Sequence, residues 1–323
     1  MRKSGFAMTH NVVVIGGGHG QAEICRGIKN IPDIQLHAIV TVADDGGSTG
    51  RLRRKFNIPA MGDIRNVMVA LAEKETMFSG LMDYRFDDPE GTQEDIAGHN
   101  LGNLILTALT KQCGSFFEAV QIIDDVLNVK GDIIPATEQV ITLYAEMADG
   151  VIVQGEANIP HMDNRIRKIF YNEDVKASPE AVDAVMHADL IILGIGSVYT
   201  SILPNVIIPE IQEAVAKTKG RKVYFCNAMT QPGETDGYSV EDHMQALADH
   251  GAYPDTVIIA DDPIPAKNEE NYLAQSSVPV RCVKKDHPYK VVRTSLLDFE
   301  DGLIRHDGKK IRDVVEKLLN GEL

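Results

Sequence analysis

The sequence contains no tryptophan, only four cysteines, and no apolar run close to the ~20 residues that cross a bilayer. The cysteines are far apart and form no C-x-x-C pair, so neither a disulfide framework nor a zinc motif is indicated. Each lies in or beside an apolar run, which is typical of buried thiols in a reducing compartment. Because MRKSGFAMTH at residues 1–10 also lacks the apolar core of a signal peptide, we expect a cytoplasmic protein without membrane insertion.

Positive charge is scarce as well. The chain has 32 Lys and Arg residues against 47 Asp and Glu, which gives a formal net charge of −15. Nucleic acids and anionic membranes repel such a surface, and this argues against both as the main partner. A local cationic pocket can still hold an anionic small molecule. The apolar fraction of 44% is ample for a sizeable core.

Short β-branched runs alternate with longer helical patterns along most of the 323 residues. Continuous apolar strands separated by amphipathic helices predict an α/β, Rossmann-like, doubly wound fold with a mainly parallel sheet. Asp149-Gly150 is a preferred hairpin turn pair, so we expect an inserted antiparallel hairpin there. We predict a disordered tail over residues 1–10 and a single domain over 11–323, with a small inserted lobe around 135–180 as the alternative.

Polar, glycine-containing loops follow the apolar strands, whereas ordinary turns precede them. In an open parallel sheet the carboxyl ends of the strands share one edge, and ligands bind in the crevice there. The sequence therefore predicts a ligand site at this edge. The loops are GGGHG (16–20), DDGGSTG (44–50), GIGSVYTSILPN (194–205), NAMTQPGETDG (227–237) and ADDPIPAKNEEN (260–271).

The first loop is close to a dinucleotide fingerprint, but Gln21 occupies the position of its third glycine. Missing side chains still let backbone N–H groups approach a phosphate at a helix start, so we expect Gly17, Gly18 and Gly20 to line a nucleotide. His19 is a candidate contact, with an exposed spectator as the alternative. Because the fingerprint is broken, an NAD-dependent oxidoreductase is only a third hypothesis.

The second loop, in VTVADDGGSTGRLRRKF (40–56), joins paired carboxylates to glycines and an arginine. Asp44 and Asp45 end a strand where they could reach a metal or a ribose, and Arg51 could pair with a phosphate. This composition suits a diphosphate bridged by Mg²⁺, with Asp44 and Asp45 as the metal ligands. Gly46, Gly47 and Ser48 complete the predicted phosphate loop. We assign Arg53, Arg54 and Lys55 to a solvated helix face.

Further polar residues stand at helix starts or strand ends. Asp63 is expected to cap the helix that begins in MGDIRN (61–66). No hydrolase elbow, Walker loop or metalloprotease motif is present, and only Asp44, Asp45 or His99 could act as a general base. Nucleotide binding is thus better supported than any reaction. The remaining candidate binding residues are Asn100, Asn103, Gly196, Ser197, Ser201, Asn227, Thr230 and Gln231.

These segments resemble the CofD-like family, and within it the gluconeogenesis-factor (YvcK-like) branch. The resemblance rests on six motifs in order and covers about residues 12–240: IGGGHG, TVADDGGSTGRLR, GDIRN, GHNLGN, GSVYTSILPN and NAMTQPGETDGYS. It implies a Rossmann-like domain in which Asp44 or Asp45 faces the metal or diphosphate. Tyr272 becomes a candidate to stack on a base or contact a sugar. His19 and Ile195 replace the Thr and Pro expected at their positions, and ADDPIP (260–265) is more acidic than expected.

The resemblance implies two different functions. One is a regulatory protein that binds a UDP-sugar such as UDP-GlcNAc and supports growth and cell shape on gluconeogenic carbon sources, with a cell-wall or shape-control protein as partner. The other is an Mg²⁺-dependent 2-phospho-L-lactate transferase acting on a nucleotide-linked donor. We favour the binding protein and expect it to form a homo-oligomer. No tightly bound organic cofactor is predicted.

Overall fold

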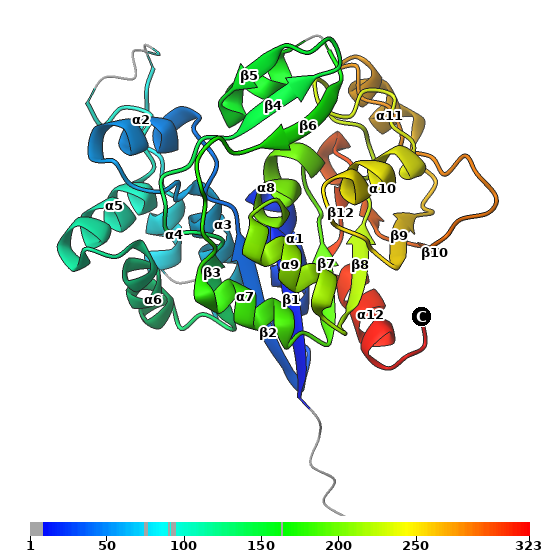
Figure 1. The fold of residues 1–323 in the computed structure, drawn as a ribbon, viewed down its shortest axis with the longest axis horizontal. Helices are drawn as coiled ribbons and strands as arrows, with labels where there is room; N and C mark the ends of the chain where they lie inside the picture. Colours follow the sequence, from blue (N-terminus) through cyan, green and yellow to red (C-terminus); the bar gives the residue numbers. More distant parts are fainter. Residues whose placement is uncertain (1–8, 74–76, 90, 92–94, 163) are drawn as a thin grey trace, which may run out of the picture.

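A seven-stranded sheet, parallel throughout, forms the centre of the computed structural model (Figure 1), which describes residues 9–73, 77–89, 91, 95–162 and 164–323. The strand order is β10-β9-β8-β7-β1-β2-β3. Val12 to Ile15 in β1, an interior strand, are fully buried, as continuous apolar runs predict for a sheet covered on both faces. The strands are β1 (His10–Gly16), β2 (Ile34–Val40), β3 (Asp132–Pro135), β7 (Leu190–Leu193), β8 (Arg221–Phe225), β9 (Thr256–Ala260) and β10 (Lys290–Thr294).

The strand order reverses direction at β1. From β1 the chain proceeds through β2 to β3, and it then returns to pair β7 with the other side of β1. The loops that follow β1 and β7 therefore diverge at their carboxyl ends. This is the topological switch point at which doubly wound proteins bind ligands.

Two groups of helices pack beside the sheet (Figure 1). In the first group, α1 contacts both α3 and α12, and in the second, α9 contacts α7 and α8. The predicted doubly wound α/β fold is confirmed. The helices are α1 (Gly18–Ile28), α2 (Gly47–Phe56), α3 (Gly62–Leu71), α4 (Met77–Asp83), α5 (Leu101–Cys113), α6 (Phe116–Leu127), α7 (Pro179–Met186), α8 (Leu203–Val206), α9 (Pro209–Lys217), α10 (Val240–Asp249), α11 (Ala266–Leu273) and α12 (Gly308–Leu319).

A second, antiparallel sheet lies above the carboxyl edge of the main one (Figure 1). It contains β4 (Tyr144–Met147), β5 (Ile152–Gln154) and β6 (Ile166–Phe170) in the order β5-β4-β6. The expected hairpin at Asp149-Gly150 joins β4 to β5, and Gly150 has a φ of +88°. A short 3₁₀ helix at Glu156–His161 follows β5 and brings the insertion down toward the loop after β2.

Two boundaries differ from the prediction. The loop after β2 is shorter than expected, because α2 already begins at Gly47 and includes Ser48 and Gly50. Most of the predicted tail lies outside the described residues, and β1 begins inside its range, at His10. Within the part of the chain that the structure describes, no helix is both long enough and apolar enough to cross a bilayer.

Candidate functional site

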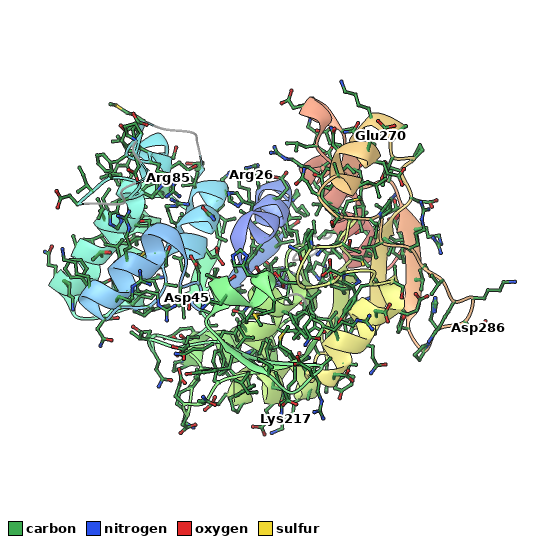
Figure 2. The ribbon with its side chains drawn as sticks, turned by 90° about the horizontal axis from the view of Figure 1, so that it is seen from above. Arg26, Asp45, Arg85, Lys217, Glu270 and Asp286 are labelled. Atoms are coloured by element: carbon green, nitrogen blue, oxygen red, sulfur yellow. The ribbon has the colours of Figure 1, made fainter. Side chains whose placement is uncertain are left out.

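A cleft of about 760 Å³ opens at the switch point, beside the start of α1. Figure 2 looks down on this edge and labels Arg26, which stands on α1, and Asp45, which follows β2. The opposite wall is built from the segment that carries β11 (Leu297–Asp298), β12 (Arg305–His306) and the first turn of α12. The lining residues that matter below are His19, Gly20, Arg26, Asn66, Ile195, Arg305 and Lys309.

Gly20 and Ile195 join the loops after β1 and β7 at the floor of this cleft. A Cβ atom on Gly20 would lie 2.3 Å from the Ile195 carbonyl oxygen, far inside contact distance. Only glycine permits this approach. Gln21, the residue that breaks the dinucleotide fingerprint, is fully buried and its amide donates to the carbonyls of Val14 and Ile39. The side chain thus ties β1 to β2 instead of leaving room for a ligand.

The lining of the cleft carries both charges, because the cations Arg26, Arg305 and Lys309 stand among the acids Glu23, Asp83, Asp298, Glu300 and Asp307. Arg305 and Lys309 are exposed on the β12 side, and His19 is exposed on the α1 side. Arg26 lies between them and forms an ion pair of 2.6 Å with Glu23. These groups suit an anionic ligand. Sequence reasoning missed all but His19, because the segment around Arg305 contains no glycine-rich motif.

Tyr272 supports the β12 side of the cleft through hydrogen bonds to the main chain of Ile304. Its hydroxyl accepts a hydrogen bond from the Ile304 N–H at 3.0 Å and donates to the Ile304 carbonyl at 3.3 Å. The ring is partly buried against the core. Tyr272 therefore fixes the main chain next to Arg305, and its predicted contact with a base or a sugar stays a prediction.

Asp63 places a carboxylate against the loop after β1. A Cβ atom on Gly17 would lie 2.5 Å from Asp63 Oδ2, and the Gly18 N–H donates to this carboxylate. Burial, and then the charge of Asp44, raise the pKa of Asp63 to about 7. The prediction that Asp63 caps α3 is wrong, because Met61 holds the cap position and Asp63 lies in the first turn. The turn directs Asp63 to the ligand edge instead.

Asp44 and Glu156 extend this group of acids. Asp44 accepts the Gly46 N–H at 2.9 Å, and burial is the main cause of its raised pKa. Burial and the charges of Asp44 and Asp63 also raise the pKa of Glu156 to about 8. Asp45 has a different role, since its Oδ1 accepts the Ala157 N–H at 2.9 Å and ties the inserted segment to the loop after β2.

The predicted residues Ser48, His99, Asn100 and Asn103 form one buried network between α2 and α5. Ser48 Oγ lies 2.8 Å from His99 Nδ1, and it accepts the Asn100 N–H at 3.3 Å and the Asn103 amide at 3.4 Å. Asn100 also caps α5. Burial and nearby cations lower the pKa of His99. Ser48 and His99 are only 5% and 6% exposed, which makes this serine–histidine pair a structural link and not an accessible nucleophile.

The basic residues of α2 differ in burial, and one of them does not lie where the sequence predicted. Arg51 donates to the Ala97 carbonyl at 2.7 Å, toward the segment that leads into α5. Arg53 is buried, and its guanidinium donates to the carbonyls of Ala43, Asp44 and Ile141. Its assignment to a solvated face is therefore wrong, whereas Arg54 and Lys55 are exposed as predicted. Arg53 is therefore a buried cation that binds the main chain at Asp44, where the sequence predicted a surface charge.

The loops after β7 and β8 are locked to each other. The Asn227 amide donates to the Gly196 carbonyl at 2.9 Å and to Gln231 Oε1 at 3.2 Å. Ser197 caps the turn at Val198–Ile202 and donates to Glu234, a buried carboxylate whose pKa burial raises. Ser201 continues this turn through its N–H, which donates to the Ser197 carbonyl.

Thr230 points away from the other predicted residues. It is 2% exposed, and its Oγ1 accepts the Val278 N–H at 2.9 Å. Its carbonyl accepts the Ser277 hydroxyl. Thr230 thus joins the loop after β8 to the segment before β10, and its contact with a ligand remains a prediction.

Most of the predicted site residues lie at one edge of the sheet, in the loops after β1, β2, β7 and β8 and at the start of α5. The acids Asp63, Glu156 and Glu234 were missed as site residues. Glu156 lies in the antiparallel insertion, outside any strand-to-helix loop, so no sequence signal pointed to it. An open parallel sheet with a polar cleft at its switch point defines a Rossmann-like α/β protein.

Comparison with known proteins narrows this class. Residues 12–297 match the family described as 2-phospho-L-lactate transferase CofD. A Bacillus subtilis protein named gluconeogenesis factor is 43% identical over 95% of this chain and 98% of its own, and a Thermotoga maritima protein named putative gluconeogenesis factor is 40% identical over 95% and 98%. A crystal structure of a Bacillus halodurans protein superimposes with a TM-score of 0.90 at 40% identity, covering 95% of this chain and 99% of that one. The chain belongs to the CofD family, as the six motifs indicated.

Proposed function

We propose that this chain is a nucleotide-sugar-binding regulatory protein, with a UDP-sugar such as UDP-GlcNAc as its ligand. The observation that carries the proposal is the cleft at the β1/β7 switch point, whose lining includes Arg26, Arg305 and Lys309, together with the buried Asp63 carboxylate against the loop after β1. The nucleoside occupies the cleft between α1 and β12. The diphosphate extends past Gly20 toward Asp63 and Asp44.

The acids fit a magnesium ion. Hard carboxylate oxygens are the protein ligands that Mg²⁺ prefers, and it commonly bridges carboxylates to a diphosphate. Burial and mutual repulsion raise the pKa values of Asp44, Asp63 and Glu156, and a divalent cation relieves both costs. Asp44 and Asp63 would hold the ion, which would neutralise charge on the ligand. Asp45 keeps one oxygen on the Ala157 N–H.

The side chains at the edge disfavour a serine nucleophile. Ser48 and His99 form a buried pair among the described residues of this edge, and Ser48 Oγ accepts hydrogen bonds from Asn100 and Asn103. Ligand occupancy then regulates a cell-wall or shape-control partner. The names of the relatives support only the link to gluconeogenic growth. Regulation requires that the ligand favour one conformation or complex over another.

Titration calorimetry of the purified chain with UDP-GlcNAc, GDP and NAD, each with and without Mg²⁺, tests the proposal. Selective UDP-GlcNAc binding supports it, and binding of none of the three contradicts it. Selective NAD binding revives the oxidoreductase hypothesis. The complementary test is growth on a gluconeogenic carbon source of a strain that lacks the chain, rescued with the wild type or with Arg305→Ala. Equal rescue by both contradicts a regulatory role for the ligand.

The alternative is an Mg²⁺-dependent transferase of the phospholactate type. The acids around Asp44 favour it, because such transfer needs positioning and charge neutralisation more than a protein nucleophile. Incubation with guanylyl-lactyl phosphate and a deazaflavin acceptor discriminates the two. Product formation that Asp44→Asn abolishes establishes the transferase, and its absence leaves the binding protein.

A further inference from the structure

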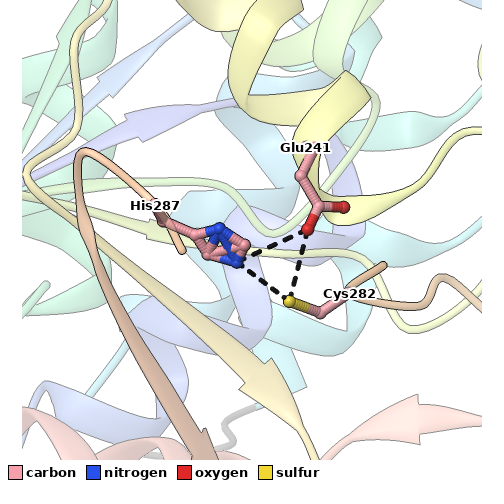
Figure 3. Close-up of side chains that lie close together, drawn as sticks. All are labelled: Glu241, Cys282 and His287. Carbon is pink, nitrogen blue, oxygen red and sulfur yellow. Dashed lines mark hydrogen bonds and ion pairs between the residues drawn. The ribbon is translucent and has the colours of Figure 1, made fainter. Parts of the chain in front are cut away.

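A second cluster of polar side chains lies away from the cleft, where the start of α10 meets the segment before β10 (Figure 3). Cys282 Sγ is 3.2 Å from His287 Nε2, and each of these two atoms is 3.4 Å from Glu241 Oε1. The three atoms therefore form a nearly equilateral triangle. Neither the nucleotide site nor any sequence motif accounts for it.

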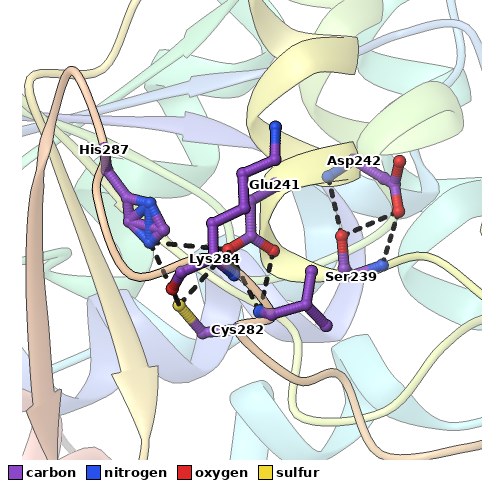
Figure 4. Close-up of polar contacts among 7 residues, drawn as sticks. Ser239, Glu241, Asp242, Cys282, Lys284 and His287 are labelled. Carbon is purple, nitrogen blue, oxygen red and sulfur yellow. Dashed lines mark hydrogen bonds and ion pairs between the residues drawn. The ribbon is translucent and has the colours of Figure 1, made fainter.

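The cluster is built on fixed elements. The first turn of α10 is held by a capping box, in which Ser239 Oγ accepts the Asp242 N–H and Asp242 Oδ2 accepts the Ser239 N–H (Figure 4). Glu241 follows in the same turn and accepts the N–H groups of Val283 and Lys284. The His287 ring stacks on Tyr289 at a centroid distance of 5.1 Å. All three side chains are thus oriented in advance.

The geometry does not suit a cysteine–histidine–acid nucleophile. In such a triad the thiol and the acid contact opposite nitrogens of the imidazole. Here Cys282 and Glu241 both face Nε2 of His287. The His287 side chain is only 6% exposed, and its Nδ1 has no hydrogen-bond partner among the described residues. The three groups converge on one point, as ligands of a metal ion do.

The spacing fits a tetrahedral zinc ion. Bond lengths of about 2.3 Å to sulfur and about 2.0–2.2 Å to nitrogen and oxygen give separations of about 3.3–3.6 Å between ligand atoms. The N–O separation of 3.4 Å matches that range, whereas the S–N and S–O separations of 3.2 and 3.4 Å are shorter than the ~3.5–3.6 Å of tetrahedral Zn²⁺, so Cys282 Sγ moves outward by a few tenths of an ångström on binding. A thiolate ligand disfavours Mg²⁺ and Ca²⁺, whereas sulfur with imidazole selects a borderline transition metal.

We propose that Glu241, Cys282 and His287 bind Zn²⁺, with a water in the fourth position. Glu241 is held in place by the Lys284 N–H at 2.8 Å from Oε1 and by the Val283 N–H at 3.1 Å from each carboxylate oxygen. On binding, the Cys282 thiol releases its proton to solvent and becomes the thiolate ligand. Cys282 also lines a cavity of about 430 Å³ formed by the loops after β8 and β9 and by residues 279–282, which gives the ion a path to the thiol.

The ion fastens the segment before β10 to α10. This segment already runs beside the loop after β8, through the Met229–Pro279 bridge and the Val280 N–H bond to Ala228. Zinc therefore stabilises the backbone next to Asn227 without contacting the nucleotide cleft. The site is independent of the proposed nucleotide function.

Cobalt substitution tests the site directly. The tag-free full-length chain is reduced, stripped with a chelator and titrated with Co²⁺ and then with Zn²⁺, while ultraviolet thiolate-to-cobalt charge-transfer absorption is followed. One equivalent of Co²⁺ should produce the band, and one equivalent of Zn²⁺ should abolish it. Cys282→Ser should eliminate the band, and His287→Gln should weaken Zn²⁺ binding, while both retain the wild-type circular dichroism spectrum.

Cys113→Ser and His187→Gln are the matched controls, because both residues lie far along the chain and outside the cluster. They should retain the band and the stoichiometry. The proposal is overturned if the wild type shows no charge-transfer band with stoichiometric Co²⁺. It is equally overturned if Cys282→Ser retains the band or if Cys113→Ser loses it.

Discussion

Gly20 and Ile195 approach so closely that a single methyl group cannot be placed between the loops after β1 and β7. The Cβ of an alanine at position 20 would lie 2.3 Å from the Ile195 carbonyl oxygen, which is a rigid main-chain atom. The floor of the cleft therefore depends on one missing side chain.

Gly20→Ala should lower the free energy of unfolding by about 1–3 kcal/mol, the usual cost of overpacking, and should weaken nucleotide binding. Gly80→Ala is the control, because a Cβ there meets no atom within 4 Å and the residue lies inside α4. It should be neutral or stabilising by up to about 1 kcal/mol. Urea unfolding of both variants measures the two free energies. Equal unfolding free energies would contradict the close approach of Gly20 and Ile195.

The buried guanidinium of Arg53 should matter far more than its exposed neighbour. Arg53→Ala leaves three main-chain carbonyls, those of Ala43, Asp44 and Ile141, without their donor. We expect a loss of about 3 kcal/mol or more in unfolding free energy, because buried unpaired acceptors cost about 1–3 kcal/mol each. Arg54→Ala should change it by less than about 0.5 kcal/mol. Denaturant unfolding measures both changes. Equally small losses of unfolding free energy for the two variants would contradict the burial of Arg53.

The acids of the site should make the metal-free protein less stable as pH rises. The folded pKa of Glu156, about 8, exceeds its ordinary value of 4.5, so the folded state binds more protons than the unfolded state between these values. Its stabilising contribution is complete below about pH 4.5 and is lost as pH rises through about 8. Asp63, with a folded pKa of about 7, acts in the same direction.

Glu156→Gln should therefore raise the melting temperature at about pH 9 in chelator, relative to wild type, and have little effect at about pH 4. The comparison between variants is needed because Asp124, away from the site, also has a pKa raised to about 8 by burial. Mg²⁺ should narrow the difference by stabilising the wild type more. If the melting temperatures of the two proteins depend identically on pH, the pKa of Glu156 is not raised in the folded state.

The exposed cations of the cleft should contribute directly to nucleotide affinity. Arg305→Ala should weaken UDP-GlcNAc binding by about tenfold to a hundredfold, because a charge-assisted hydrogen bond contributes about 1.5–3 kcal/mol. Lys317→Ala, which alters an exposed residue later in α12, should leave the affinity unchanged. Calorimetry on both variants is the measurement. Equal affinities would place the ligand outside this cleft.

The sequence predicted the fold well because its signals are local. Buried strands such as Val12 to Ile15 read as continuous apolar runs, and Asp149-Gly150 marks its own hairpin. The edge that carries the polar loops also followed from local patterns, since parallel strands end on the same side.

The roles of individual residues depended on contacts that the sequence does not encode locally. Arg53 appears in a run of basic residues, yet it donates to carbonyls of the preceding loop and to that of Ile141, 88 residues later. Asp63 looks like a helix cap, but it lies two residues after the cap residue Met61 and contacts the loop after β1. Glu156 reaches the site from the inserted sheet, and Glu241 meets Cys282 only through tertiary packing. Such pairings over long sequence separations require the folded chain.

The most direct test of the account is a crystal structure of the chain grown with UDP-GlcNAc and Mg²⁺. The account predicts the nucleoside in the cleft between the first turn of α1 and β12, near Arg305, with the diphosphate and the metal on the side of Asp44 and Asp63. A nucleotide bound at any other face of the protein, or a diphosphate directed away from these acids, would contradict it.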